Sequence, residues 1–272
     1  MKKIIVFSLV TLFLILGGLF IFLKEGNYLV VPQAEKETLK AEVSETLTPK
    51  QDQKTSNQDV VLPKTFKLDV SFTSQEPRVF IPGNYTGNNK LWNDDHNNAC
   101  EEAAIIMVDS YIKGKKLTPE IADKEILAML NFQEKNYRER NKDLEAKEIV
   151  QLAKDYYKDY ENTKVVYDIS IEDIKREIFA GHPVILPTAG RMLFGPLFLG
   201  MNPNYRSPGP LYHMLVAIGW NDNEREIITN DSGTRKGESF TFGYDVLLSA
   251  LHNWDDEKKL PEGKSVMIII LP

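Results

Sequence analysis

Residues 212–231 read YHMLVAIGWNDNEREIITND, two apolar runs separated by a short polar segment. The runs at 214–218 and 226–228 are rich in β-branched residues, and asparagine, aspartate and glycine bound them, as is typical of strands joined by a turn. The pattern predicts a hairpin in which the start of the first strand lies beside the end of the second.

The hairpin would bring His213 and Asp231 together, because they stand at those two strand ends. The carboxylate could then accept a hydrogen bond from the imidazole and stabilise its protonated form, and Asn230 could do so more weakly. On position alone, each residue also fits a structural role, as a half-buried histidine and as part of an ordinary Asp-Ser-Gly turn.

The rest of the outer part of the chain divides into helices followed by strands. Apolar residues recur at helical spacing in the first half, and Thr118-Pro119 and Ser170 are typical helix starts. We expect helices near residues 98–114, from 118, and over 143–157, 171–180 and 244–251, and further strands at 165–167, 184–186 and 266–270. Helices first, then a largely antiparallel sheet, indicate an α+β domain.

Cys100 is the single cysteine, and it falls in the first turn of the first of these helices. Asn98 is the expected N-cap, with Glu101 as its partner. Free backbone N–H groups at a helix start favour a thiolate and can bind the oxyanion formed when a carbonyl is attacked. Glu101 and Glu102 oppose thiolate formation, and a lone cysteine on a helix is more often a small core residue.

Other catalytic or metal motifs are not present in the sequence. There is no HExxH, GxSxG, P-loop or GxGxxG pattern, and one cysteine cannot build a thiolate-rich zinc site. No metal or cofactor is therefore expected. The other histidines, His96, His182 and His252, are predicted to lie at the surface.

The first 25 residues predict an N-terminal membrane anchor. An uncharged apolar run covers residues 4–23, long enough as a helix to cross a bilayer core of about 30 Å. A cleaved signal peptide is the alternative, although no small-x-small site follows the run. Lys2 and Lys3 predict that the N-terminus stays inside, which places the remainder outside the cell membrane, or secreted after cleavage.

Residues 26–64 are rich in Glu, Lys, Thr, Gln and Ser, and such a segment cannot bury enough apolar surface to fold, so we expect a flexible linker. The folded domain would span 65–272. A net charge of −6 without a basic stripe argues against nucleic acid as a partner. The sequence does not indicate an oligomeric state.

Several segments together resemble the C39-like (peptidase C39_2 type) papain-like cysteine peptidases over roughly residues 67–255. They are Ser71-Phe72-Thr73-Ser74-Gln75, Leu91-Trp92-Asn93, Ala99-Cys100-Glu101-Glu102-Ala103, Gly181-His182-Pro183-Val184-Ile185, residues 208–220 around His213, and residues 228–234 around Asp231. Two departures stand out. The loop 76–91 is longer than expected, and Ser232 replaces the usual proline.

The resemblance implies a papain-like fold and a cysteine peptidase with Cys100 as nucleophile, His213 as its base and Asp231 as the acid that orients it. Gln75 matches the position of the glutamine that donates to the oxyanion. Because of the longer loop, Asn84, Asn93 or Asp94 remain alternatives at that corner.

Two other functions fit the sequence. One is a non-catalytic papain-like binding or scaffold module at the cell surface, and the other is an amidase acting on peptidoglycan stems. The expected partners are accordingly a peptide, protein or cell-wall peptide, together with the membrane through residues 4–23.

Overall fold

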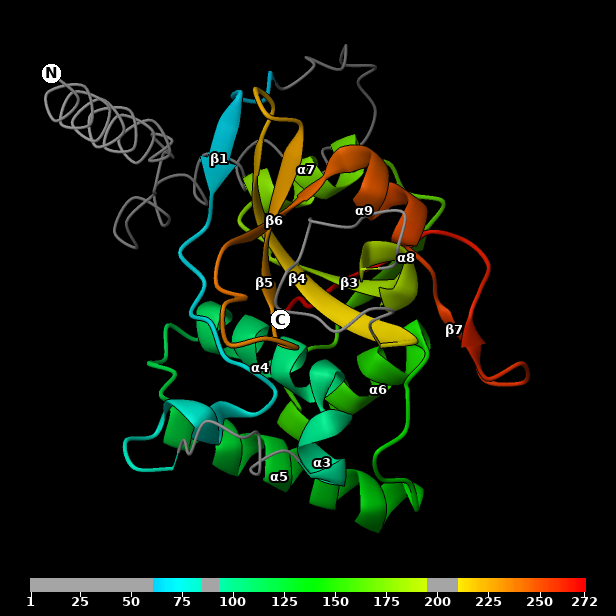
Figure 1. Ribbon diagram of the computed structural model, residues 1–272. Helices are drawn as coiled ribbons and strands as arrows, with labels where there is room; N and C mark the ends of the chain where they lie inside the picture. Colours follow the sequence, from blue (N-terminus) through cyan, green and yellow to red (C-terminus); the bar gives the residue numbers. More distant parts are fainter. Residues whose placement is uncertain (1–60, 85–92, 195–209) are drawn as a thin grey trace, which may run out of the picture.

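The computed structural model describes residues 61–84, 93–194 and 210–272 (Figure 1). The expected membrane helix over 4–23 and most of the expected linker over 26–64 lie outside these residues. Among the helices that are described, none is long and apolar enough to cross a membrane.

One antiparallel sheet forms the centre of the domain. In the described ranges six strands follow the order β2-β9-β3-β4-β5-β6, and a seventh, β1, pairs with the far end of β4. Within the same ranges β7 pairs only with β8. The strands are β1 (Thr65–Lys67), β2 (Lys164–Tyr167), β3 (Val184–Ala189), β4 (Tyr212–Asn221), β5 (Glu226–Asp231), β6 (Phe240–Gly243), β7 (Trp254–Asp255), β8 (Leu260–Pro261) and β9 (Val266–Ile269).

The helices precede and interrupt the strands. They are the 3₁₀ helix η1 (Pro77–Phe80), α3 (Asp94–Asn97), α4 (Cys100–Ile112), α5 (Pro119–Tyr137), α6 (Ala146–Tyr157), α7 (Ile171–Phe179), α8 (Gly190–Phe194) and α9 (Tyr244–Ala250). Thr118 and Ser170 cap α5 and α7 as predicted, each side chain accepting a backbone N–H of the first turn. Helix α6 begins three residues later than expected, behind a Glu145–Glu148 capping box.

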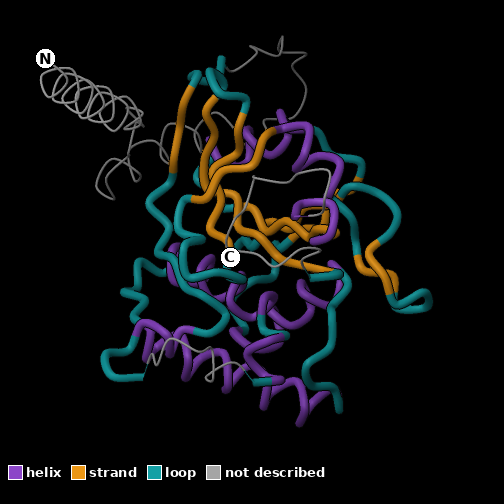
Figure 2. The backbone as a smooth tube through the Cα atoms, viewed as in Figure 1, coloured by secondary structure: helices purple, strands orange, loops and turns teal. Residues whose placement is uncertain are grey.

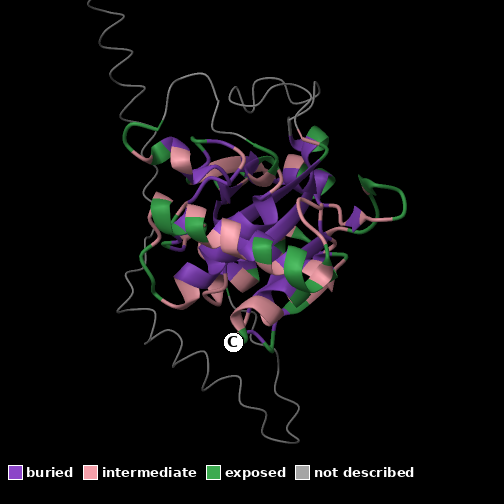
Figure 3. Ribbon diagram, turned by 90° about the horizontal axis from the view of Figure 1, so that it is seen from below, coloured by how far each residue is buried: buried purple, intermediate pink, exposed green. Residues whose placement is uncertain are grey.

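Helices and strands occupy separate layers. Figure 1 shows α3, α4, α5 and α6 gathered below the strands, with α8 and α9 at the upper right, and the tube in Figure 2 shows the same separation. Viewed from below, buried residues fill the middle of the domain and exposed residues lie on its outer helices and loops (Figure 3). The α+β prediction is confirmed.

Helix α4 lies inside the domain rather than on its surface. Every residue from Cys100 to Ser110 is buried, whereas the sequence predicted only one apolar stripe. The helix packs against β4 on one side and α5 on another, and α7 also packs against β4. Strand β4 is consequently buried along its whole length, which explains its continuous apolar run.

The hairpin predicted from residues 212–231 is confirmed. Strand β4 pairs antiparallel with β5, and Leu215 stands opposite Asp231. His213 lies two residues before Leu215, so its side chain shares the face of the sheet that carries Asp231. The register therefore determines which carboxylate meets the imidazole.

Candidate active site

Cys100 is the first residue of α4. Its N-cap is Ala99, which offers no side-chain hydrogen bond, so the expected Asn98 cap is wrong. The side chain of Asn98 instead donates to the carbonyl of Asp94 in α3. The backbone N–H groups at the start of an α-helix have no partner within the helix, so this end can still supply donors to an oxyanion.

The thiol of Cys100 is buried and faces a carboxyl group. Its Sγ donates a hydrogen bond to Glu101 Oε2 across 2.9 Å, and the residue is only 5% exposed. Burial raises the pKa of the Cys100 thiol well above its ordinary value, and the charge of Glu101 raises it further. The thiolate-promoting effect expected from the helix start is thus opposed by burial, which the sequence did not reveal.

His213 and Asp231 form a direct hydrogen-bonded pair. The ring Nε2–H donates to Asp231 Oδ1 across 2.7 Å, and both side chains are buried. The same Oδ1 accepts the backbone N–H of Gly233, and the backbone N–H of Asp231 donates to the carbonyl of Gly237. These bonds hold the carboxylate of Asp231 in place beside the imidazole ring.

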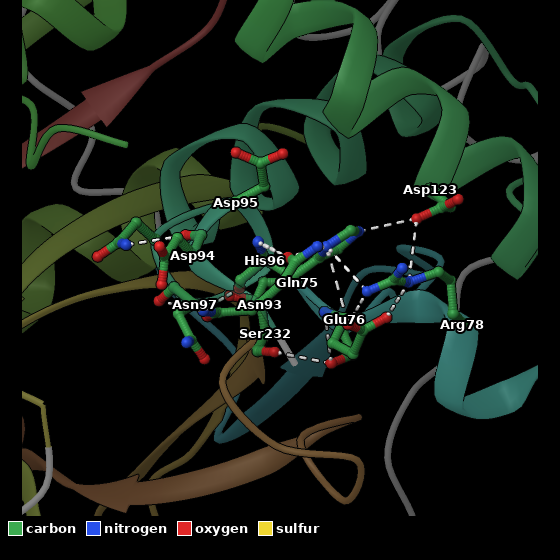
Figure 4. Close-up of polar contacts among 12 residues, drawn as sticks. Gln75, Glu76, Arg78, Asn93, Asp94, Asp95, His96, Asn97, Asp123 and Ser232 are labelled. Atoms are coloured by element: carbon green, nitrogen blue, oxygen red, sulfur yellow. Dashed lines mark hydrogen bonds and ion pairs between the residues drawn. The ribbon is translucent and has the colours of Figure 1, made fainter. Parts of the chain in front are cut away.

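Gln75 connects the two ends of the site. Its Nε2 donates to the carbonyls of His96 and Asn97, just before α4, and its backbone N–H donates to the carbonyl of Ser232, just after Asp231 (Figure 4). The segment that precedes Cys100 and the segment that follows Asp231 therefore meet at Gln75.

Both amide hydrogens of Gln75 are used in this arrangement, so a role for the side chain in the oxyanion site requires it to rotate. The alternatives are placed differently: Asn84 and Asp94 are exposed, and the Asn93 side chain caps α3 by accepting the N–H of His96. The second part of the family's motif, Leu91-Trp92, lies outside the described residues.

A cluster of polar groups, buried at Glu76 and His96 and half-buried at Arg78 and Asp123, supports the turn that Gln75 contacts. His96 is 1% exposed, contrary to the surface position expected for it, and its Nε2 bonds Asp123 Oδ1 across 2.8 Å (Figure 4). Arg78 donates two hydrogen bonds to the carboxylate of Glu76, and its Nη2 lies 3.1 Å from His96 Nδ1. The cluster joins η1, α3 and α5, which are separate in the sequence. It therefore holds the segment of chain that leads into Cys100 at the start of α4.

The cluster also contains the one group of described residues with possible metal ligands. One ligand atom from each of Glu76, His96 and Asp123 lies within 4.8 Å of the others. The Arg78 guanidinium already occupies this group and supplies the positive charge that a cation would bring. The donor set thus suits an arginine-centred structural network better than a metal.

Glu101 and Glu102 are buried side by side at the start of α4. Oε1 of Glu101 accepts the backbone N–H of Leu144, and Oε1 of Glu102 accepts from Gln133 Nε2. Burial raises the pKa of Glu101 to about 8 and that of Glu102 to about 7, from an ordinary value of 4.5. Their sequence signal is two carboxylates directly before the apolar run 103–108, although their partners could not be known.

Comparison with known proteins identifies a family for most of the chain. Residues 67–256 match the Peptidase C39-like family, nearly the range over which the motifs were recognised. A proposed C39-like peptidase from Bacillus anthracis, known from a crystal structure, aligns at 15% identity and a TM-score of 0.39, covering 75% of this chain and 96% of that one. No curated protein matches the sequence significantly.

The buried glutamates predict a stability that falls with rising pH. The folded domain holds protons on Glu101 and Glu102 that the unfolded chain releases above pH 4.5. The contribution of these protons to the free energy of unfolding is therefore fully present below pH 4.5 and is lost as the pH rises through about 7 to 8. Urea unfolding should show a lower midpoint at pH 8.5 than at pH 5. Glu102→Gln should recover about 1 kcal/mol or more at pH 8.5, since one pKa unit is worth about 1.4 kcal/mol.

The control for this measurement is Glu161→Gln, which removes an exposed carboxylate. It should leave the pH dependence unchanged. A midpoint that is constant from pH 5 to 8.5 in the unmodified protein would show that the two carboxyls are not titrating as described.

The close contact between Gly237 and the backbone of Asp231 can be tested by substitution. A Cβ at Gly237 would lie 1.8 Å from the carbonyl oxygen of Asp231, so that alanine must displace this backbone. Gly237→Ala should cost about 1–3 kcal/mol of unfolding free energy and slow alkylation of Cys100. Gly243→Ala is the matched control, because a Cβ there meets nothing within 4 Å. Equal stabilities of the two variants would contradict the close contact.

Proposed function

Because the chain belongs to the Peptidase C39-like family, we propose that its folded domain hydrolyses amide bonds in peptides with Cys100 as the nucleophile. The observation that carries the proposal is the buried His213–Asp231 pair, whose ring nitrogen is held by a carboxylate on the adjacent strand. A base oriented in this manner is what a cysteine or serine nucleophile requires.

The proposed reaction begins with proton transfer from the Cys100 thiol to His213 Nδ1. The thiolate attacks the amide carbonyl, and the oxyanion is held by the backbone N–H of Cys100 and, after rotation, by the Gln75 amide. His213 then gives its proton to the leaving nitrogen as the C–N bond breaks, leaving a thioester. Water, deprotonated by His213, attacks the thioester and restores the thiol.

The charge balance of the site supports this role for Asp231. Imidazolium formed at His213 would be a buried cation, and such a charge is costly without a partner. Asp231 supplies the opposite charge at hydrogen-bond distance, and its Oδ1 also accepts the backbone N–H of Gly233. The pair can therefore accept the thiol proton without an unpaired buried charge.

A second candidate is a non-catalytic papain-like module. It is favoured by the burial of Cys100, by the raised pKa of its thiol and by the use of both Gln75 amide hydrogens within the protein. In that case the folded domain would bind a peptide or protein without cleaving it.

We further propose that residues 4–23 anchor the chain in the membrane and that the domain lies on the outer side. The length of the apolar run and the lysines before it support this placement.

Labelling with a cysteine-directed activity probe tests the catalytic proposal. Cys100 is the single cysteine, so all labelling reports on it. His213→Ala should slow labelling at pH 7 by about a hundredfold or more, because general base catalysis is worth that much, and Asp231→Asn should slow it less. His252→Ala is the matched control and should label at close to the wild-type rate. Slow labelling of the wild-type protein that His213→Ala does not change supports the module instead.

Membrane fractionation tests the anchor. The full chain should sediment with membranes and require detergent for release, whereas a chain lacking residues 1–25 should stay in the soluble fraction. Protease added to intact cells should cleave the full chain if the domain lies outside. Release of the full chain by salt or alkaline wash alone would exclude a membrane-spanning anchor.

A further inference from the structure

The carboxyl group of Glu101 is in hydrogen-bond contact with the sulfur of Cys100. Glu101 is 1% exposed, and its Oε2 is 2.9 Å from Sγ. Its other oxygen, Oε1, accepts the backbone N–H of Leu144 across 3.1 Å. The two oxygens therefore face different partners, one a fixed donor and the other the thiol.

This arrangement determines where a proton on Glu101 would reside. Oε1 faces a backbone N–H and can only accept there, so the neutral acid would carry its proton on Oε2. Oε2 is the oxygen that faces Cys100. A neutral Glu101 consequently presents an O–H donor to the sulfur, and an ionised Glu101 presents an acceptor for the S–H.

The surroundings of Glu101 are mostly acidic or neutral. Glu102 from α4, Asp143 from the segment before α6 and Tyr212 from β4 face it, and Arg140 lies near Glu102. The Tyr212 hydroxyl donates to the carbonyl of Leu144, the residue whose N–H binds Glu101. Burial among these groups favours the neutral acid near pH 7.

We propose that Glu101 is a further catalytic residue of the Cys100 site, whose neutral carboxyl donates a hydrogen bond to the thiolate and whose ionised form holds the thiol protonated. The inference rests on the function proposed above and adds a residue to the same site. A hydrogen bond to a charged acceptor is stronger than one between neutral groups, so the neutral acid stabilises the thiolate.

Protons balance in both states. With Glu101 neutral, the thiol proton moves to His213 Nδ1, and Glu101 keeps its own proton in the bond from Oε2 to sulfur. With Glu101 ionised, the thiol keeps its proton and donates it to Oε2. In this state a thiolate beside the carboxylate would place two negative charges in contact. Neither state requires an additional reactant.

The pH dependence of Cys100 alkylation by iodoacetamide tests this role in the full chain, solubilised in detergent. The wild-type rate should be highest near pH 7 and should fall several-fold as Glu101 ionises above about pH 8. Glu101→Gln keeps an acceptor for Leu144 and a permanent N–H donor for sulfur. It should therefore react at a rate similar to the wild type at pH 7 and lose the fall at higher pH.

Two more variants separate a catalytic role from a structural one. Glu101→Leu removes the donor and should slow alkylation at pH 7 by about tenfold or more. Glu102→Gln removes the neighbouring buried carboxyl, which does not touch the sulfur, and should keep the alkaline fall. If Glu101→Leu does not fold, the pH profile of Glu101→Gln still tests the role of Glu101, because glutamine is nearly isosteric with glutamate.

The outcomes distinguish this inference from the proposed function. If His213→Ala slows alkylation but Glu101→Gln shows the same alkaline fall as the wild type, the Glu101 role is wrong and the Cys100–His213 mechanism stands. A wild-type rate for Glu101→Leu at pH 7 overturns the inference in the same way. If His213→Ala has no effect on the rate, both fail together.

Discussion

The packing of α4 between β4 and α5 is the constraint on which the rest of the domain depends. It buries every residue from Cys100 to Ser110, and with them the thiol and the carboxyls of Glu101 and Glu102. Each of these groups must then find its partner inside the protein, because an unpaired polar group away from water is costly. Leu144 and Gln133 each donate to one oxygen of Glu101 and Glu102, respectively, and the Cys100 thiol donates to the other oxygen of Glu101.

The same packing makes the electrostatics of the site a balance between two effects. A helix start lowers a thiol pKa, whereas burial and a neighbouring carboxylate raise it, and here burial is the larger effect. In the proposed mechanism, a neutral Glu101 removes the repulsion and leaves the helix start and His213 to stabilise the thiolate. Buried carboxyls that reduce stability near neutral pH are then consistent with a functional site, since such sites often trade stability for reactivity.

Local patterns were enough to predict much of the fold. The strands β2, β3, β4, β5 and β9, the caps at Thr118 and Ser170 and the hairpin follow from periodicity and turn residues, whereas β1, β6, β7 and β8 were not predicted. The hairpin register brings His213 to Asp231. The motifs also led to the family. The expected Asn98 cap was wrong because the side chain has a local partner, the carbonyl of Asp94. Other predictions were wrong where a residue's partner comes from a distant segment.

His96 shows the reason most clearly. It stands in a polar stretch, but Arg78 and Asp123, which are 18 and 27 residues away, enclose it. Pattern reasoning sees spacing along one element and not the approach of three elements to one point. The burial of Glu101 and the use of the Gln75 amide were missed for the same reason, although Gln75 itself was found from its motif.

The central claim is that the Cys100 sulfur and the His213–Asp231 pair act as one unit. The most direct measurement is a crystal structure of the domain after Cys100 has reacted with a peptide chloromethyl ketone. The account predicts His213 Nδ1 within about 4 Å of the modified sulfur, with Nε2 still bonded to Asp231. An imidazole turned away from the sulfur, in a domain whose fold is otherwise unchanged, would contradict it.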